Sequence, residues 1–389
     1  MKSVELFAGA GGLALGVSQA GFSHEAVVEW DHDACDTIRA NQRLQIEHVR
    51  DWRLTEGDVR NFNYASLPGD IDLLAAGVPC QPWSIGGKHR GFEDERNLFP
   101  ETIRAVLRLR PKAILIENVR GLTRQSFANY FSYIQWMLRF PEVKRRSSED
   151  WTEHRRRLER YAASDGKGYG GLRYNVLARV VNAADYGVPQ KRERVFIVAF
   201  RDDLGIKWSF PPETHSQDAL LISQWVTGEY WDRHGVPKKS RPRTPSGVER
   251  RTSDLMTFGQ NAWRTVRDAL AGLPEPDRRG SCEITNHVFQ PGARRYMGHT
   301  GSPLDEPAKT LKAGDHGVPG GENMIAFPDE SVRYFTVREA ATLQSFPQDF
   351  VFSSSWSENM RQLGNAVPVE LGRIMAREIR ARLENRTTR

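Results

Sequence analysis

Apolar runs alternate with helix-like segments through the first two hundred residues. Five runs are short, continuous and rich in Val, Ile and Leu, as buried strands of a parallel sheet are. These expected strands lie at 3–8, 25–30, 71–76, 112–119 and 194–200. Amphipathic helical patterns lie between them at 12–20, 33–46, 99–109 and 126–139. Strand and helix alternating in this way predict an α/β fold with a doubly wound, mostly parallel Rossmann-like sheet.

The alternation stops after residue 200, where Pro, Gly, Ser and Arg become frequent. This composition predicts a second, smaller and irregular domain over about 201–325. Four of its aromatic residues are expected to be exposed: Trp225, Tyr230, Trp231 and Trp263. Order returns at about 326, so 326–389 is expected to complete the first domain, 1–200. No helix precedes the first strand, so the amphipathic helix expected at 369–384 should cover that face and bring residues 364–367 beside the first glycine-rich turn.

Charge is distributed unevenly along the chain. The net charge is +6, but residues 1–100 carry −6 and residues 101–200 carry +10. A basic balance favours a polyanionic partner such as nucleic acid, although an ordinary solvated surface is the alternative. The basic segment 144–173 is expected to be a solvated surface helix, with phosphate contacts as the other interpretation.

The remaining composition excludes several classes of protein. The three cysteines, at 35, 80 and 282, have no CxxC spacing, so neither a metal site nor a disulfide framework is expected. A signal peptide is not recognisable, and no apolar run approaches the ~20 residues that span a membrane. We therefore expect a reduced, cytoplasmic protein.

The glycine-rich stretch ELFAGAGGLALG (5–16) leads from a strand into a helix, which brings backbone amides against a ligand. Its GAGG spacing differs from the GxGxxG of dinucleotide sites. The second strand ends in Glu29 and Trp30, a carboxylate for ribose hydroxyls and an indole that could stack on adenine. Asp58, in GDVRNF, could accept a hydrogen bond from an adenine amino group. A ligand with adenine and ribose but no pyrophosphate fits, and S-adenosyl-L-methionine is one.

Three further stretches carry candidate chemistry. Cys80 lies between Pro79 and Pro82, where the backbone is stiff and cannot be helical, so it is either an incidental residue of a turn or a nucleophile. Cys80 follows the expected strand 71–76, and Glu117 ends the expected strand 112–119, so both should lie at the carboxyl edge of the sheet. Glu117 is either a capping residue or an acid that points into the cofactor crevice at that edge. Arg192 and Arg194 enter a strand two residues apart and should project to one face, where they are solvated or clamp a base oxygen or a phosphate.

Together these stretches resemble the bacterial restriction-modification type of DNA (cytosine-5-)-methyltransferases. The order is that of the family: FAGAGG, Glu29-Trp30, GDV, PCQPWS, ENV, QKRER, REAATLQSFP and GNAVP. The resemblance implies a methyltransferase domain interrupted by a target-recognition domain, with S-adenosyl-L-methionine as cofactor and S-adenosyl-L-homocysteine as product.

The resemblance also implies roles. Cys80 would add to carbon 6 of a flipped-out cytosine, Glu117 would bind ring nitrogen 3 and the exocyclic amine, Arg194 would reach the base carbonyl oxygen, and Arg192 would orient the Cys80 loop. The implied cofactor residues are Phe7, Gly9, Gly11, Gly12, Leu13, Glu29, Trp30, Asp58, Val59, Pro79, Asn365, Ala366 and Val367. The implied DNA-binding residues are Gln81, Ser84, Lys88 and Arg90.

The expected partners follow from the same resemblance: double-stranded DNA, and a cognate restriction endonuclease without a stable complex. The enzyme is expected to be a monomer, away from membranes and associated with the nucleoid. The alternative is an RNA (tRNA) cytosine-5 methyltransferase, but about a hundred irregular residues favour duplex DNA. An inactive DNA-binding module would not explain the intact Cys80 and Glu117, and a nicotinamide oxidoreductase would leave PCQPWS unexplained.

Overall fold

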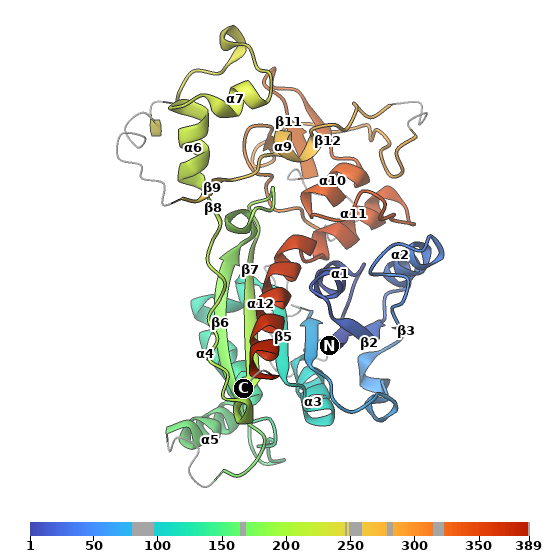
Figure 1. Ribbon diagram of the computed structural model, residues 1–389, viewed down its shortest axis with the longest axis vertical. Helices are drawn as coiled ribbons and strands as arrows, with labels where there is room; N and C mark the ends of the chain where they lie inside the picture. Colours follow the sequence, from blue (N-terminus) through green and yellow to red (C-terminus); the bar gives the residue numbers. More distant parts are fainter. Residues whose placement is uncertain are drawn as a thin grey trace. The chain divides into compact units, whose positions relative to one another are not determined.

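The computed structural model describes residues 1–79, 97–163, 169–245, 247–248, 259–277, 283–313 and 323–387. The backbone packs into two compact units (Figure 1). The first, which we call the sheet unit, comprises Met1–Val181, Glu193–Pro211 and Gly372–Arg389. The second unit comprises Asn182–Arg192 and Pro212–Leu371. The expected boundaries at 201 and 326 stay predictions, because compact packing does not tell which residues recognise a substrate.

One sheet has the strand order β3–β2–β1–β4–β5–β7–β6. The strands are β1 (Lys2–Leu6), β2 (Ser23–Glu29), β3 (Leu54–Glu56), β4 (Leu73–Gly77), β5 (Ala113–Val119), β6 (Tyr174–Asn182) and β7 (Glu193–Arg201). Strands β1 to β5 pair in parallel, which confirms the expected doubly wound, mostly parallel sheet.

Two strands depart from the expectation. The run at 194–200 is not parallel: β7 lies antiparallel to β5. Its connection from the neighbouring strand β6 spans only residues 183–192, which is too short for a parallel crossover, so β6 and β7 run in opposite directions. Strand β6 was not expected at all, because its sequence YNVLARVVN is not a continuous apolar run; most of its residues are exposed or half-buried. As the last strand in the sheet order, β6 is an edge strand.

The order of the strands locates the crevice of the sheet. From β1 the chain goes to β2 and β3 on one side, and then to β4 on the other side of β1. Ligands of open α/β sheets bind outside the carboxyl ends of the strands where the winding reverses. In this sheet that point lies between the ends of β1 and β4. A Cβ at Gly77 would lie 3.3 Å from the carbonyl oxygen of Phe7, so the two strand ends approach closely.

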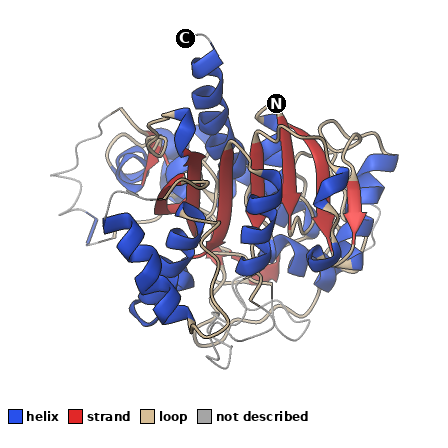
Figure 2. Ribbon diagram, turned by 90° about the horizontal axis from the view of Figure 1, so that it is seen from below, coloured by secondary structure: helices blue, strands red, loops and turns tan. Residues whose placement is uncertain are grey.

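Helices lie on both faces of the sheet (Figure 2). The helices of the sheet unit are α1 (Gly12–Gln19), α2 (His32–Arg43), α3 (Phe99–Leu109), α4 (Ala128–Arg139), α5 (Trp151–Ala163) and α12 (Val369–Thr387, from Gly372 on). Within the part of the chain that the structure describes, no helix is long and apolar enough to cross a membrane.

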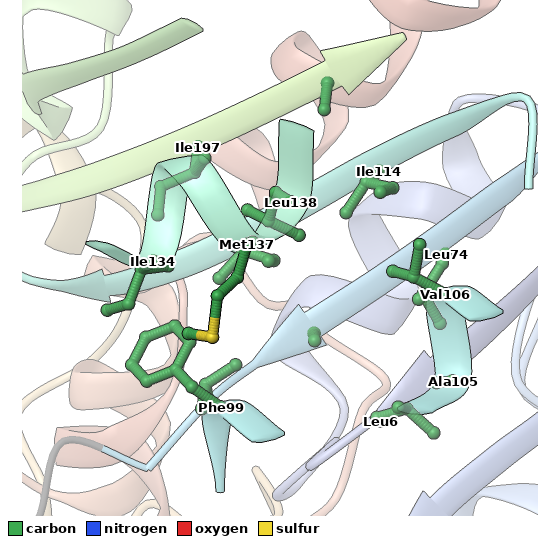
Figure 3. Packing of buried hydrophobic residues seen from close by; sticks show 14 of the residues in the cluster. Leu6, Leu74, Phe99, Ala105, Val106, Ile114, Ile134, Met137, Leu138 and Ile197 are labelled. Atoms are coloured by element: carbon green, nitrogen blue, oxygen red, sulfur yellow. The ribbon is translucent and has the colours of Figure 1, made fainter. Parts of the chain in front are cut away.

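Helices α3 and α4 cover one face of the sheet (Figure 3). On α4, the buried side chains at 134, 137 and 138 follow the spacing of a helical stripe. They pack with the α3 side chains against β1, β4, β5 and β7. The residues in contact include Phe99, Ala105, Val106, Ile134, Met137 and Leu138 from the helices and Leu6, Leu74, Ile114 and Ile197 from the strands.

Helix α12 packs against α1, as expected for the terminal helix. A Cβ at Gly372 would lie 3.2 Å from Cδ1 of Leu13, so the helices meet where one of them has no side chain. Farther along, Nη1 of Arg380 donates to the carbonyl oxygen of Ala20 (3.0 Å). The expected position of residues 364–367 beside the glycine-rich turn stays a prediction, because those residues belong to the second unit.

The basic segment 144–173 contains α5, a surface helix as expected. His154 and Leu158 anchor it: His154 Nε2 bonds the Val143 carbonyl oxygen (2.7 Å), and Leu158 is fully buried. Glu142, just before the segment, pairs with Arg110, which lies near the start of β5. The segment is thus tied to the amino-terminal edge of the sheet, opposite the carboxyl edge. This position favours a plain insertion over DNA contacts.

The second unit is built from short elements. They are β8 (His215–Ser216), β9 (Asn261–Ala262), β10 (Ser302–Pro303), β11 (Met324–Ala326), β12 (Val332–Tyr334), α6 (Gln217–Trp225), α7 (Glu229–Arg233), α9 (Val266–Leu270), α10 (Val337–Leu343) and α11 (Trp356–Asn365). The expectation of exposed aromatic residues is wrong here. Tyr230 and Trp231 are buried and form a small core with Leu220, and Trp225 and Trp263 pack partly buried against it. A domain with little regular structure needs its large side chains as a core.

Glu5 stands out within the sheet because it is a fully buried carboxyl group in the middle of β1. Its neighbours Val4 and Leu6 point into the α3–α4 core, so Glu5 points to the opposite face. Neither oxygen has a hydrogen-bond partner among the described residues. Burial therefore raises the pKa of Glu5 well above its ordinary value of 4.5.

Because Glu5 is buried, the free energy of unfolding should fall as pH rises, and Glu5→Gln should remove this loss of stability. Below pH 4.5 the carboxyl is neutral in both states. As pH rises, the unfolded chain ionises first, so the free energy of unfolding falls by up to ~1.4 kcal/mol per pH unit until the folded pKa is reached. In urea unfolding between pH 5 and pH 8, Glu5→Gln should gain ~1.4 kcal/mol or more over the unsubstituted protein. Glu47→Gln, on a side chain that is 82% exposed, is the control without this gain. If the free energy of unfolding had the same pH dependence in Glu5→Gln as in the unsubstituted protein, the raised pKa of Glu5 would be contradicted.

Candidate active site

The turn after β1 is held in an unusual backbone conformation. Phe7, Gly9 and Gly11 all have positive φ, at 58°, 55° and 90°. For a phenylalanine this conformation costs on the order of 1–3 kcal/mol. A Cβ at Gly11 would lie 2.7 Å from the ring of Trp52, whereas one at Gly9 would meet no described atom within 4 Å. Gly11 is therefore required by packing, and Gly9 leaves open space beside the backbone.

Glu29 fixes this turn. Its Oε2 accepts from the amide of Gly9 (2.7 Å), and its Oε1 accepts from the amides of Trp30 (2.9 Å) and Asp31 (2.8 Å). Burial raises the pKa of the Glu29 carboxyl, and the three amide hydrogen bonds oppose that shift. The expected ribose acceptor thus also ties the end of β2 to the turn after β1. Oε2, which among the described residues accepts only from the Gly9 amide, has a second lone pair for a further donor.

The other expected cofactor residues of the sheet unit surround the same strand ends. The indole of Trp30 is 75% exposed, as a stacking surface requires. Asp58 follows β3 and caps the 3₁₀ helix Val59–Asn61 by accepting from the amide of Arg60 (2.8 Å). Gly12 and Leu13 open α1, whose amino end is capped by no side chain among the described residues. First-turn amides of an uncapped helix suit an anionic group.

Asn118, which was not among the expected site residues, fixes the backbone just before Cys80. Asn118 is buried, and its Nδ2 donates to the carbonyl oxygen of Val78 (3.0 Å). Its Oδ1 accepts from the amide of Val119 (2.9 Å). The side chain therefore ties the end of β5 to the chain two residues before Cys80. An amide side chain within an apolar strand was the signal that could have identified it.

Five expected residues lie outside the described residues: Cys80, Gln81, Ser84, Lys88 and Arg90. Pro79 is the last described residue before them, and it is half-buried.

Glu117 and Arg194 form a nearly buried ion pair, with 2.9 Å between Arg194 Nε and Glu117 Oε1. The register explains the pairing. Glu117 lies opposite Gly77 of β4, and Arg194 lies opposite Val119 of β5. Because β7 is antiparallel, its first residues lie at the edge where β4 and β5 end. The pair therefore lies beside the strand end that leads to Cys80.

Arg192 has different partners from those of Arg194. Its guanidinium is fully buried and donates to three carbonyl oxygens of the second unit: Leu311 (3.0 Å), Gly364 (2.6 Å) and Ala366 (2.8 Å). The interpretation that the two arginines are solvated is wrong, because Arg194 is only 9% exposed. Arg192 thus holds the backbone of the GNAVP stretch, and its implied role toward the Cys80 loop stays a prediction.

The other implied cofactor residues of that stretch are Asn365, Ala366 and Val367. Ala366 and Val367 are buried and Asn365 is exposed. The position before them requires glycine, since a Cβ at Gly364 would lie 2.3 Å from the amide nitrogen of Ala313.

One of the three cysteines, Cys35, is excluded as a nucleophile. Cys35 lies buried on α2, and burial raises the pKa of its thiol to about 12. Its Sγ contacts the carbonyl oxygen of Glu29 at 3.6 Å. At neutral pH such a thiol stays protonated and inert.

Comparisons with known proteins show the family of this chain. A family model described as C-5 cytosine-specific DNA methylase matches residues 1–140 and 167–381, and the gap between the two matches contains α5. Type II methyltransferase M.PspPI of Psychrobacter sp. (strain TA137) is 32% identical over 381 residues, which cover 97% of this chain and 78% of that protein. Type II methyltransferase M.NgoMIV of Neisseria gonorrhoeae is 32% identical over 385 residues, covering 97% and 96%.

Among solved structures, a DNA modification methyltransferase encoded within an Escherichia coli prophage aligns over 99% of both chains. Its TM-score of 0.56 at 20% identity supports the Rossmann-like fold alone. The family model, by contrast, matches most of the sequence, including every described strand of the sheet. The chain therefore belongs to the C-5 cytosine-specific DNA methylase family, whose enzymes take their methyl group from S-adenosyl-L-methionine.

Proposed function

We propose that this enzyme methylates carbon 5 of a cytosine in a defined sequence of duplex DNA, through a covalent adduct of the base with Cys80. The observation that carries the proposal is the register of β4, β5 and β7. It places Glu117 beside Gly77, three residues before Cys80, and Arg194 against Glu117. A nucleophile on that loop would have an acid and a cation within reach of the same base.

Cys80 would supply the activation that cytosine needs, because carbon 5 of the free base is a poor nucleophile. The thiolate adds to carbon 6 and forms an S–C6 bond, and the electron pair of the 5,6 double bond makes carbon 5 nucleophilic. After carbon 5 has gained its methyl group, it loses its proton to a water molecule that acts as the base. The electrons of that C–H bond restore the double bond as the S–C6 bond breaks, which releases Cys80.

Glu117 and Arg194 would hold the base during this addition. The exocyclic amine donates to Glu117, which when protonated donates to ring nitrogen 3, where negative charge develops. Arg194 donates to the carbonyl oxygen at carbon 2. The two side chains are already positioned by their ion pair, so little reorganisation is needed when the base enters.

The turn after β1 fits the donor. When bound, S-adenosyl-L-methionine supplies an electrophilic methyl group on a sulfonium sulfur. Trp30 would stack on its adenine, Glu29 and Asp58 would accept from its ribose and amino groups, and the amides that open α1 would bind its carboxylate. The open space at Gly9 supports close approach of the ligand to the backbone.

The reacting carbons of cytosine are inaccessible in a stacked duplex, so the target nucleotide would swing out of the helix. Gln81, Ser84, Lys88 and Arg90, which follow the nucleophile, would contact the DNA. We further propose that the enzyme acts as a monomer in the cytoplasm at the nucleoid. A cognate endonuclease would act on the same sequence without a stable complex.

Bisulfite sequencing tests the reaction and separates DNA from RNA as substrate. DNA from cells that express the chain should contain cytosines that resist conversion, in one recurring sequence. Expression of Cys80→Ala should leave none. Resistant cytosines in tRNA but not in DNA would favour the RNA methyltransferase, and none in either would refute the catalytic proposal.

The purified enzyme provides a second measurement of the same prediction. On a duplex that carries 5-fluorocytosine in the target sequence, the unsubstituted protein should form an adduct that survives denaturing electrophoresis. Cys80→Ala should form none, whereas the matched control Cys35→Ala should form it normally.

Asn118 should position the nucleophile loop. Asn118→Ala removes the donor to Val78, so adduct formation should slow by on the order of tenfold, about 1.4 kcal/mol. Asn118→Asp should behave alike, because a carboxylate cannot donate to that carbonyl. The affinity for S-adenosyl-L-homocysteine, measured by calorimetry, should stay within about threefold, or about 0.7 kcal/mol, because this hydrogen bond lies outside the expected cofactor site.

Asn129→Ala, at an exposed position on α4, is the matched control for this test and should leave the rate of adduct formation unchanged. The positioning role would be contradicted by an unaltered rate of adduct formation in both Asn118 variants. It would also be contradicted by a loss of affinity for S-adenosyl-L-homocysteine as large as the loss of rate.

A further inference from the structure

The second unit presents a tight turn with an apolar tip. Tyr296 and His299 form an antiparallel bridge, in which the amide of His299 donates to the carbonyl oxygen of Tyr296 (2.8 Å). Gly298 has a φ of 79°, the left-handed conformation that a type II turn requires at its second central residue. Met297 and Gly298 thus form the tip. We call residues 293–300 the Met297 turn.

The tip lacks any cover from the described residues. Met297 is 98% exposed and Tyr296 is 56% exposed. A Cβ at Gly298 would meet no described atom within 4 Å. The Tyr296 ring packs on the imidazole of His299, with centroids 4.3 Å apart and planes 33° apart. The turn therefore presents a preformed pair of rings beside an exposed thioether.

The base of the turn is cationic. Arg294 and Arg295 directly precede Tyr296, and both are exposed. Arg295 lies 3.6 Å from Glu330, whose side chain is 84% exposed, so this pair is solvated and contributes little. Lys309 adds a further cation, its Nζ donating to Oγ1 of Thr300 (2.7 Å). Apolar groups at a tip with cations behind it suit a ligand whose apolar interior is flanked by anions.

We propose that the Met297 turn enters a groove of the DNA duplex and contributes to recognition of the target sequence. The major groove admits a two-stranded ribbon, and apolar side chains there contact the methyl groups of thymine. Arg294 and Arg295 contact the flanking phosphates, which positions the tip on the bases. This inference rests on the proposed function, because it assumes duplex DNA as the substrate.

Binding to duplexes tests the inference. The probes are the sequence found by bisulfite sequencing and the same duplex with one base pair changed, measured by fluorescence anisotropy at several salt concentrations. Met297→Ala should lose on the order of tenfold affinity for the target and part of its discrimination against the altered duplex, with an unchanged salt slope. Arg294→Ala/Arg295→Ala should weaken binding to both duplexes and reduce the slope of log K against log salt by about 1.8.

Val226→Ala is the matched control, since Val226 is an apolar residue of the same unit that is 59% exposed. It should bind both duplexes as the unsubstituted protein does. Unchanged target affinity and discrimination in Met297→Ala, or an unchanged salt slope in the double variant, would overturn the inference. DNA methylation by the unsubstituted protein distinguishes failure of this inference from failure of the proposed function. If the unsubstituted protein methylates DNA, only the role of the Met297 turn is wrong. If it does not, the proposed function itself fails.

Discussion

The position of β5 between two neighbours of opposite direction is the constraint on which the candidate site depends. On one side its parallel pairing with β4 sets Glu117 opposite Gly77, and on the other its antiparallel pairing with β7 sets Val119 opposite Arg194. A slip of one residue in either pairing would move every side chain to the other face. The register therefore decides whether an acid and a cation meet beside the chain that leads to Cys80.

The same edge carries the turn after β1, and its polar groups are fixed by backbone hydrogen bonds. Glu29 links β2 to the turn after β1, and Asn118 links β5 to Val78. Buried polar side chains of this kind cost desolvation unless they are satisfied. Their bonds to main-chain atoms hold the ends of four strands in one arrangement before any ligand binds, and such preorganisation is what electrostatic catalysis requires.

The sequence was sufficient to predict the sheet, its main helices and the candidate residues at its edge, because buried parallel strands are continuous apolar runs that are easily seen. It was insufficient for β6 and for the direction of β7, which depend on a short connection and on tertiary pairing. The exposure of Tyr230 and Trp231 was predicted wrongly, since composition alone does not show that an irregular domain uses its aromatic residues as a core. The partners of Arg192 were also unpredictable, because the carbonyls of Leu311 and Gly364 are far away in sequence.

The covalent Cys80 mechanism can be tested by a crystal structure of the enzyme with S-adenosyl-L-homocysteine and a duplex that carries 5-fluorocytosine at the target position. We predict a flipped base whose carbon 6 is bonded to Sγ of Cys80. The carboxyl group of Glu117 should lie within hydrogen-bond distance of ring nitrogen 3 and the exocyclic amine, with Arg194 on the carbonyl oxygen. A base that is held at another strand end, or that makes no bond to Cys80 and leaves the Glu117–Arg194 pair untouched, would contradict it.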